Sequence, residues 1–275
     1  MSLQIDADQA VLPALALSCS AQGVSVALAT TREQARPVIE CWHEPDSAGR
    51  SDALLSAVDG LLRANDVSVA ALRLLCVEVG PGPFTAIRMT CSVAQGISLA
   101  AGVPCVEVWS TEALALQAVA GRPAGRHRVW VAVDARMGEV YAATVDIVTG
   151  PGGGLRQVVE SGPCTVSPPD KSWALSGPGL APDGSSDLLI AGNAGTLISG
   201  FAEQIERQAI EAGWRVVHAS SATVLRADSV LGVGLWRAGS ACLEPVAPRY
   251  VRNKVALDVA EQAAARGRAA EARRA

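Results

Sequence analysis

A glycine- and proline-rich loop is the first stretch of this sequence whose residue types suggest chemistry. It reads Gly80-Pro81-Gly82-Pro83 and lies between an apolar run and a stretch with helical spacing. A loop that opens a helix offers backbone N–H groups and the positive end of the helix dipole to an anion such as phosphate. Pro81 and Pro83 have no N–H to donate, and the lysine of G-x-x-x-x-G-K-[ST] phosphate loops is missing. We therefore favour a turn that sets the direction of the helix, a vestigial phosphate loop of Gly80, Gly82 and Thr85, with Thr85 as cap or ligand.

A second group whose residue types could take part in a reaction is Asp134, Arg136 and Glu139, within "DARMGEVY". Carboxylates and a guanidinium at this spacing suit acid–base chemistry. The competing interpretation is a hairpin turn, in which Asp134 and Arg136 close locally while Glu139 and Tyr141 share one face of the next strand. We favour the hairpin and leave a role in conformation or partner contact open.

Nucleophilic and metal-dependent chemistry gain little support. The three histidines, at positions 43, 127 and 218, form no H-x-x-x-H pair that would place two imidazoles on one helix face. The "SCS" at 18–20 ends an apolar run, where a nucleophile can sit, but no neighbouring histidine completes a relay. We predict small packed polar residues there, no catalytic residue, no metal site and no cofactor.

Composition and charge narrow the class of protein. The chain has 275 residues, 49% of them hydrophobic, and a net charge of -4, which gives no global reason to bind a polyanion. Seven scattered cysteines without a C-x-x-C pair indicate small core residues in a reducing compartment rather than disulfides or zinc ligands. No stretch approaches the ~20 apolar residues of a membrane-spanning helix, and the first residues are acidic, unlike a signal peptide. We expect a soluble cytoplasmic protein without membrane contact.

Hydrophobic periodicity predicts the elements that must position these residues. In the first half it gives an order βββαβαβα. The expected strands lie near 12–20, 24–31, 36–42, 72–79 and 104–109, and the expected helices at 51–65, 85–101 and 110–121.

The second half of the sequence begins with the same predicted strand hairpin as the first half. "RVWVAVDARMGEVYAATVDI" repeats the opening hairpin, so the chain starts its fold twice. Beyond it we expect β-like pieces at 155–160 and 173–175, a strand leading into a helix near 197–212, a strand at 214–220 and a helix over 222–242. We assign residues 11–110 with 222–250 to an N-terminal lobe and 111–221 to a smaller second lobe. We leave the role of the loop-rich stretch 149–188 open and expect a flexible tail at 257–275.

Three motifs carry a resemblance to a known family. "VEVGPGPFTAIRMTCSVAQGISLAAGVP", "VAVDARMGEVYAA" and "PVAPRYVRNKVA" resemble the TsaB (YeaZ) family of bacterial tRNA threonylcarbamoyladenosine biosynthesis proteins, and the similarity spans about residues 12–256. The resemblance implies an α/β fold with two lobes of the actin-like ATPase (ASKHA, ribonuclease H-like) type, each built on a βββαβαβα unit, the second less regular. It also implies a non-catalytic subunit that binds and supports the TsaD transferase in forming N6-threonylcarbamoyladenosine at position 37 of tRNAs reading ANN codons.

The resemblance extends to partners. It implies a TsaD-like transferase and a TsaE-like ATPase, tRNA contact only through the complex, and it leaves a homodimer of the isolated chain open. The sequence departs from the family pattern at two places. The first strand commonly ends Asp-Thr/Ser-Thr/Ser but here ends "SCS", and the loop commonly reads G-P-G-S-F-T-G but here has Pro83 and Ala86. Both changes weaken nucleotide binding. An active ATP-dependent phosphotransferase or peptidase of the same fold remains the alternative, with Asp134 as its best-placed acidic residue.

A stripe of small residues on the helix at 85–101 is the candidate partner surface. Small side chains that recur every four residues let another helix approach closely. The alternative is close packing against this protein's own sheet, which the spacing does not exclude. The resemblance implies pairing with TsaD through the helices at 51–65 and 85–101, and the candidate contact residues are Leu54, Val58, Ala86, Thr90, Ala94 and Ser98.

Overall fold

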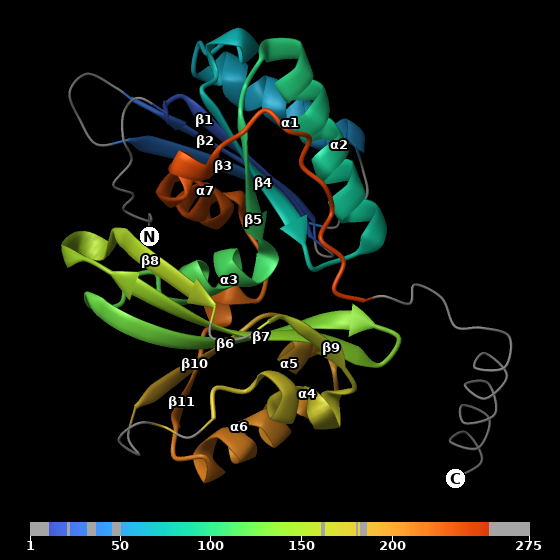
Figure 1. Ribbon diagram of the computed structural model, residues 1–275, viewed down its shortest axis with the longest axis vertical. Helices are drawn as coiled ribbons and strands as arrows, with labels where there is room; N and C mark the ends of the chain where they lie inside the picture. The colour runs from blue at the N-terminus through green and yellow to red at the C-terminus, as the bar shows by residue number, and fades with distance from the viewer. Residues whose placement is uncertain are drawn as a thin grey trace, which may run out of the picture.

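The chain folds into two α/β lobes, each built on one mixed sheet, as the computed structural model in Figure 1 shows. The structure describes residues 11–20, 23–31, 37–45, 51–160, 163–179, 181 and 186–252. The expected α/β fold class is confirmed. None of the helices in this described part of the chain has the length and apolar character that a membrane crossing requires.

The first sheet has the strand order β3-β2-β1-β4-β5. A meander of β1 (Ala14–Ser20), β2 (Gly23–Thr30) and β3 (Val38–Pro45) is followed by β4 (Leu74–Gly80) and β5 (Cys105–Trp109), which run parallel to β1. Alternating residues of β1 serve two cores. Leu15 and Leu17 pack toward α1 (Ser51–Ala64) and α2 (Phe84–Ala101), whereas Ala14 and Ala16 pack toward α3 (Ser110–Ala118) and α7 (Ala227–Trp236). Both faces of this sheet are therefore covered.

The second sheet has the order β11-β10-β6-β7-β8, with β9 paired to β7. Its strands are β6 (Gly125–Arg136), β7 (Glu139–Thr149), β8 (Leu155–Glu160), β9 (Thr165–Ser167), β10 (Asp187–Ala191) and β11 (Arg215–His218). Trp130 of β6 packs outward against α6 (Phe201–Glu211), and Val129 and Val131 pack inward toward α3. The repeated opening hairpin predicted from the sequence is present as β6 and β7.

Helices α3 and α7 lie against each other between the two sheets (Figure 1). They join residues of both sheets into one continuous core. Gly234 allows α7 to lie directly on β4, because a Cβ at this position would be 2.3 Å from the Cys76 Sγ. The lobe boundaries expected from the sequence, at 110, 111, 221 and 222, stay a prediction.

Three elements of the second half differ from the sequence prediction. The stretch 173–175, expected as β, lies in helix α4 (Pro169–Ser176), which begins with a proline at its first position and Asp170 in its first turn. The expected helix at 197–212 begins only at Phe201, as α6, after Gly200, which has a φ of 70°; the short helix α5 (Ala194–Leu197) precedes it. The expected helix at 222–242 is shortened to α7. The tail at 257–275 lies outside the described residues.

Candidate functional site

The glycine–proline loop connects β4 to α2 and is covered by residues 242–252, which we call the C-terminal segment. The N–H of Arg249 donates to the Val79 carbonyl at 2.8 Å. Gly80 has a φ of +111°, and a Cβ there would lie 2.9 Å from Ile87 Cδ1 and 3.1 Å from the Arg249 carbonyl oxygen. The loop therefore needs a glycine at this position, both because of its φ and because Ile87 and the C-terminal segment leave no room for a Cβ.

The first turn of α2 is attached to the C-terminal segment by an aromatic contact. Phe84 stacks on Tyr250 with ring centroids 5.1 Å apart. The Arg88 guanidinium lies 3.6 Å from the Phe84 ring centroid, and its Nε donates to the Tyr250 hydroxyl at 2.7 Å. Thr85 is exposed, and the residue at the N-cap is Pro83, so the capping role considered for Thr85 is wrong.

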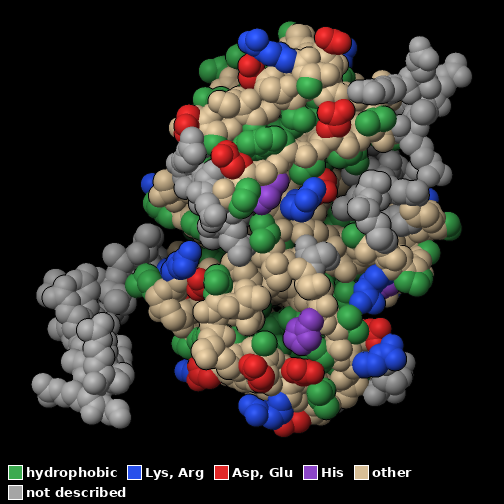
Figure 2. Space-filling model, turned by 180° about the vertical axis from the view of Figure 1, so that it is seen from behind, with side chains coloured by type: hydrophobic (Ala, Val, Ile, Leu, Met, Phe, Trp, Pro, Cys, Tyr) green, Lys and Arg blue, Asp and Glu red, His purple; other side chains and the backbone are tan. Residues whose placement is uncertain are grey.

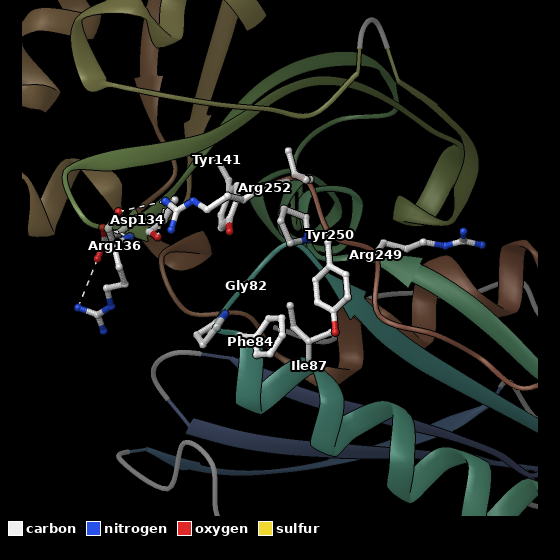
Figure 3. A pocket seen from close by; sticks show the side chains of 13 residues that line it. Gly82, Phe84, Ile87, Asp134, Arg136, Tyr141, Arg249, Tyr250 and Arg252 are labelled. Atoms are coloured by element: carbon white, nitrogen blue, oxygen red, sulfur yellow. Dashed lines mark hydrogen bonds and ion pairs between the residues drawn. The ribbon is translucent and has the colours of Figure 1, made fainter. Parts of the chain in front are cut away.

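A cavity of about 250 Å³ lies between this loop and the β6–β7 hairpin of the second lobe (Figure 3). Pro81, Gly82 and Phe84 form one wall, and the hairpin residue Asp134 and the Tyr141 side chain lie across from them. Pockets for drug-sized ligands usually measure roughly 300–1,000 Å³. The cavity is thus below the size that such a ligand occupies.

The hairpin closes as the local turn predicted from the sequence. The N–H of Arg136 donates to the Asp134 Oδ1 at 2.9 Å, and the side chains of the two residues form an ion pair at 3.4 Å. The N–H of Asp134 donates to the Asn193 Oδ1 at 2.9 Å. Glu139 pairs with Arg252 of the C-terminal segment, whose guanidinium lies 6.0 Å from the Tyr141 ring. This hairpin therefore contacts the C-terminal segment directly.

The arginines of the cavity wall all have carboxylate partners. A phosphate group binds where guanidinium groups are available to it. In the described structure each of these guanidinium groups already contacts an acid, in the pairs Arg136–Asp134, Arg249–Glu107 and Arg252–Glu139. The wall therefore has little uncompensated positive charge to offer an anion.

A buried carboxylate that the sequence analysis did not identify lies behind the loop. Glu78 is 2% exposed; its Oε2 accepts from the Ser18 hydroxyl at 2.7 Å and the Cys19 N–H at 3.0 Å, and its Oε1 accepts from the Ser110 hydroxyl at 2.7 Å. Burial raises the pKa of Glu78 although these hydrogen bonds act to lower it. The carboxyl group therefore joins β1, β4 and the start of α3. The signal was an acid within the apolar stretch "LLCVEVG".

The end of β1 has the packed character predicted from the sequence. Ser18 is buried, and burial raises the pKa of the Cys19 thiol to about 12. A thiol with so high a pKa is a poor nucleophile because little thiolate is present at neutral pH. Across the described residues, no group of three or more histidines, cysteines and acids is arranged to hold a metal ion.

The candidate partner stripe faces the chain's own sheet. Thr90 and Ala94 are 0% exposed, and the Thr90 hydroxyl donates to the Ala86 carbonyl at 3.0 Å. Ser98 is half-buried and donates to the Val103 carbonyl at 2.7 Å. This stripe thus packs against the protein's own sheet, which was the alternative interpretation of the sequence. It is not an exposed surface, and this corrects the expected position of Leu54, Val58, Ala86, Thr90 and Ala94, which all lie in the core.

The opposite faces of the same two helices carry small residues that are exposed. Both faces have the pattern S-x-x-x-G-x-x-x-A. Among the described residues, a Cβ added at either central glycine would meet no atom within 4 Å apart from the neighbouring backbone of its own helix. We call these faces the outer stripes, Ser56, Gly60 and Ala64 of α1 and Ser92, Gly96 and Ala100 of α2.

Acidic and basic side chains are interspersed on the face of the molecule shown in Figure 2. Neither lobe gathers its Lys and Arg side chains into one basic patch on that face (Figure 2). This distribution agrees with the net charge of -4. It gives this face no electrostatic footprint for direct tRNA binding.

Known proteins resemble parts of this chain in sequence. Residues 45–160 match the family model of TsaD, tRNA N6-adenosine threonylcarbamoyltransferase. The tRNA threonylcarbamoyladenosine biosynthesis protein TsaB of Escherichia coli is 38% identical over 90 residues, 33% of this chain and 38% of that protein. The TsaB of Haemophilus influenzae is 31% identical over 136 residues, 49% of this chain and 54% of that protein. The matches thus span about half or less of the curated relatives' length.

The structural similarity covers more of the chain. YeaZ from Pseudomonas aeruginosa superposes with a TM-score of 0.65 and 26% identity, covering 86% of this chain and 98% of that one. A protein described as uncharacterized, with similarity to peptidase YEAZ from Pseudomonas aeruginosa, gives a TM-score of 0.64 and 27% identity, covering 87% and 99%. The resemblance found in the sequence is confirmed: this chain has curated homologues named TsaB in several bacteria, and its structural neighbours are YeaZ proteins.

Proposed function

We propose that this chain is a TsaB-type subunit in the synthesis of N6-threonylcarbamoyladenosine in tRNA, and that it supports a TsaD-like transferase without catalysing the transfer. The names of the curated relatives support the pathway. The observation that carries the non-catalytic part is the position of the C-terminal segment, which lies on the only candidate phosphate loop identified in the sequence.

The chemistry of the cleft supports the same proposal. Phosphotransfer with a magnesium nucleotide needs a carboxylate open to the metal and donors open to the phosphates. Glu78 is buried and its carboxyl group is occupied by Ser18, Cys19 and Ser110. Asp134 is held by Arg136. The groups that could perform the alternative reaction are thus engaged in holding the fold.

The outer stripes supply the partner surface. A glycine inside a helix costs roughly 0.8–1 kcal/mol relative to alanine. Gly60 and Gly96 occupy equivalent places in two packed helices, and no other element in the described part of the chain lies within 4 Å of where their Cβ would be. Close approach of a helix from another chain accounts for both glycines. We assign this face to the TsaD-like transferase, and a second copy of this chain would use the same face in a homodimer. A TsaE-like ATPase and tRNA join through the complex.

Depletion of this protein from its own cell tests the proposed pathway. The content of threonylcarbamoyladenosine in tRNAs that read ANN codons should fall, as mass spectrometry of digested nucleosides would show. Unchanged content after verified depletion contradicts the proposal. ATP turnover by the isolated chain that Asp134→Asn abolishes would instead favour the phosphotransferase.

A further inference from the structure

Two free thiols belong to residues that pair across the edge of the first sheet. Cys105 begins β5, and Cys242 begins the C-terminal segment. The Cys105 N–H donates to the Cys242 carbonyl at 2.8 Å, and the Cys242 N–H donates to the Cys105 carbonyl at 3.1 Å. An antiparallel pair that exchanges both hydrogen bonds has its Cα atoms about 5.5 Å apart and its side chains on the same face. Disulfides join residues whose Cα atoms are roughly 4.4–6.8 Å apart and whose Cβ atoms are roughly 3.5–4.5 Å apart. The Cβ atoms of a hydrogen-bonded pair are about 5.5 Å apart, so the Cys242 backbone must move slightly toward β5 as the bond forms.

The two thiols differ in exposure in the way that sequential oxidation requires. Cys242 is exposed, which departs from the core position expected for all seven cysteines, and Cys105 is 3% exposed. Burial raises the pKa of the Cys105 thiol although a hydrogen bond with Ser98 acts to lower it. Cys105 also lines a surface cavity of about 390 Å³ between Leu99 and Leu243. A small oxidant in solution therefore meets Cys242 first and leaves Cys105 in place to react with the product.

We propose that Cys105 and Cys242 are a site of reversible oxidation at which a peroxide joins the two thiols in a disulfide. The Cys242 sulfur attacks one oxygen of hydrogen peroxide. An S–O bond forms and the O–O bond breaks, so that Cys242 becomes a sulfenic acid and one water is released. The Cys105 sulfur then attacks the Cys242 sulfur. The S–S bond forms, the S–O bond breaks, and the hydroxide departs with the Cys105 proton as a second water. Two electrons and two hydrogens pass to the peroxide, and a dithiol reductant restores the thiols by exchange.

The remaining buried thiols near this pair are poorer participants. Burial raises the pKa of the Cys91 thiol to about 12, and Cys91 lies on the face of α2 that packs on the sheet. The Cys76 side chain faces α7 on the other side of the sheet from Cys105. The bond would fix the start of the C-terminal segment to β5. It therefore acts on the segment that covers the glycine–proline loop.

The test uses the full chain, purified in reduced form and treated with a small molar excess of hydrogen peroxide. Free thiols are then alkylated and the protein is digested without reduction. We expect a peptide in which Cys105 is joined to Cys242, an intact mass lower by two hydrogens, and full reversal by dithiothreitol. The thermal midpoint should rise by at least about 5 °C, because a cross-link that closes so long a loop restricts the unfolded chain.

Two variants define the outcome. Cys242→Ser should abolish both the mass loss and the rise in thermal midpoint. Cys164→Ser removes a half-buried thiol of the second lobe and should leave both unchanged. A cross-link from Cys242 to another cysteine, or over-oxidation of Cys242 to the sulfinic acid without any cross-link in the folded chain, would overturn the proposal.

Discussion

Gly96→Leu is the substitution that separates partner binding from folding most sharply. Gly96 is exposed in the middle of α2, and an added Cβ meets open space. The free chain should become more stable, because leucine favours an exposed helix interior over glycine by roughly 0.8 kcal/mol. For a chain of this size, the thermal midpoint should rise by about 1–3 °C.

The effect on the complex should have the opposite sign. A leucine at the centre of an outer stripe holds a partner helix away from α2, and overpacking of this kind costs about 1–3 kcal/mol. The dissociation constant should rise about tenfold or more, since each 1.4 kcal/mol corresponds to a factor of ten. Damage to the fold would lower stability, so it does not explain a gain in stability together with a loss of affinity.

The assay is isothermal titration of the purified chain with the TsaD-like protein from the same organism. Gly60→Leu on α1 should behave as Gly96→Leu does. The matched control is Ala174→Leu, which enlarges an exposed small residue on α4 of the second lobe and should leave the affinity unchanged. Unaltered affinity of both glycine variants would refute the assignment of the outer stripes to this partner.

Three further predictions concern the core. Ala94→Leu enlarges a residue that is 0% exposed and should lower the free energy of unfolding in urea by about 1–3 kcal/mol. An unchanged value would mean that the inner stripe of α2, which consists of Ala86, Thr90, Ala94 and Ser98, is loosely packed. Because burial raises the pKa of Glu78, the folded chain holds the carboxyl proton more tightly than the unfolded chain does, so the free energy of unfolding should fall as pH rises above the usual glutamate pKa. Glu78→Gln should remove that fall. Identical pH profiles of the variant and the parent chain would contradict this prediction. For Asp146, burial acts to raise the pKa but hydrogen bonds from Arg128 and Arg126 hold it below the usual range. The stabilisation by Asp146 is thus present above the unfolded pKa and lost as pH falls through the folded pKa. Asp146→Asn should reduce this loss of the thermal midpoint at acid pH. A loss at acid pH as large as that of the parent chain would count against the prediction.

The first lobe could be predicted from the sequence almost completely. Its strands are short apolar runs separated by turn residues, and its helices have apolar residues at helical spacing, so local pattern and tertiary packing agree. The helix at 169–176 was missed because Trp173 and Leu175 alternate with smaller residues as in a strand. The helical signals there, Pro169 and Asp170, precede the apolar residues. A short element contains too few residues for its periodicity to be recognised.

The candidate site was less predictable, because its contacts join residues far apart in the chain. A spacing of four identifies a stripe on α2 but not which of two stripes faces the sheet. Ile87 and Cys91, both buried, flank the inner stripe, and this apolar flank was the available signal. The contact of Arg249 with Val79 has no local signal, since nothing in either stretch specifies the other. The turn at the glycine–proline loop could be predicted because proline chemistry is local.

The C-terminal segment also determines how the first sheet ends. Strand β5 is the last strand of that sheet. Its hydrogen-bonding groups are occupied by Cys242 through the backbone bridge and by the Arg237 side chain, which donates to the Glu107 carbonyl at 3.1 Å. An uncovered edge strand is a template on which a second chain adds its own strand. A chain shortened before Cys242 would lose the backbone bridge to Cys105 and the buried Val246 side chain, so this part of the edge would be open, and the chain should aggregate by strand addition.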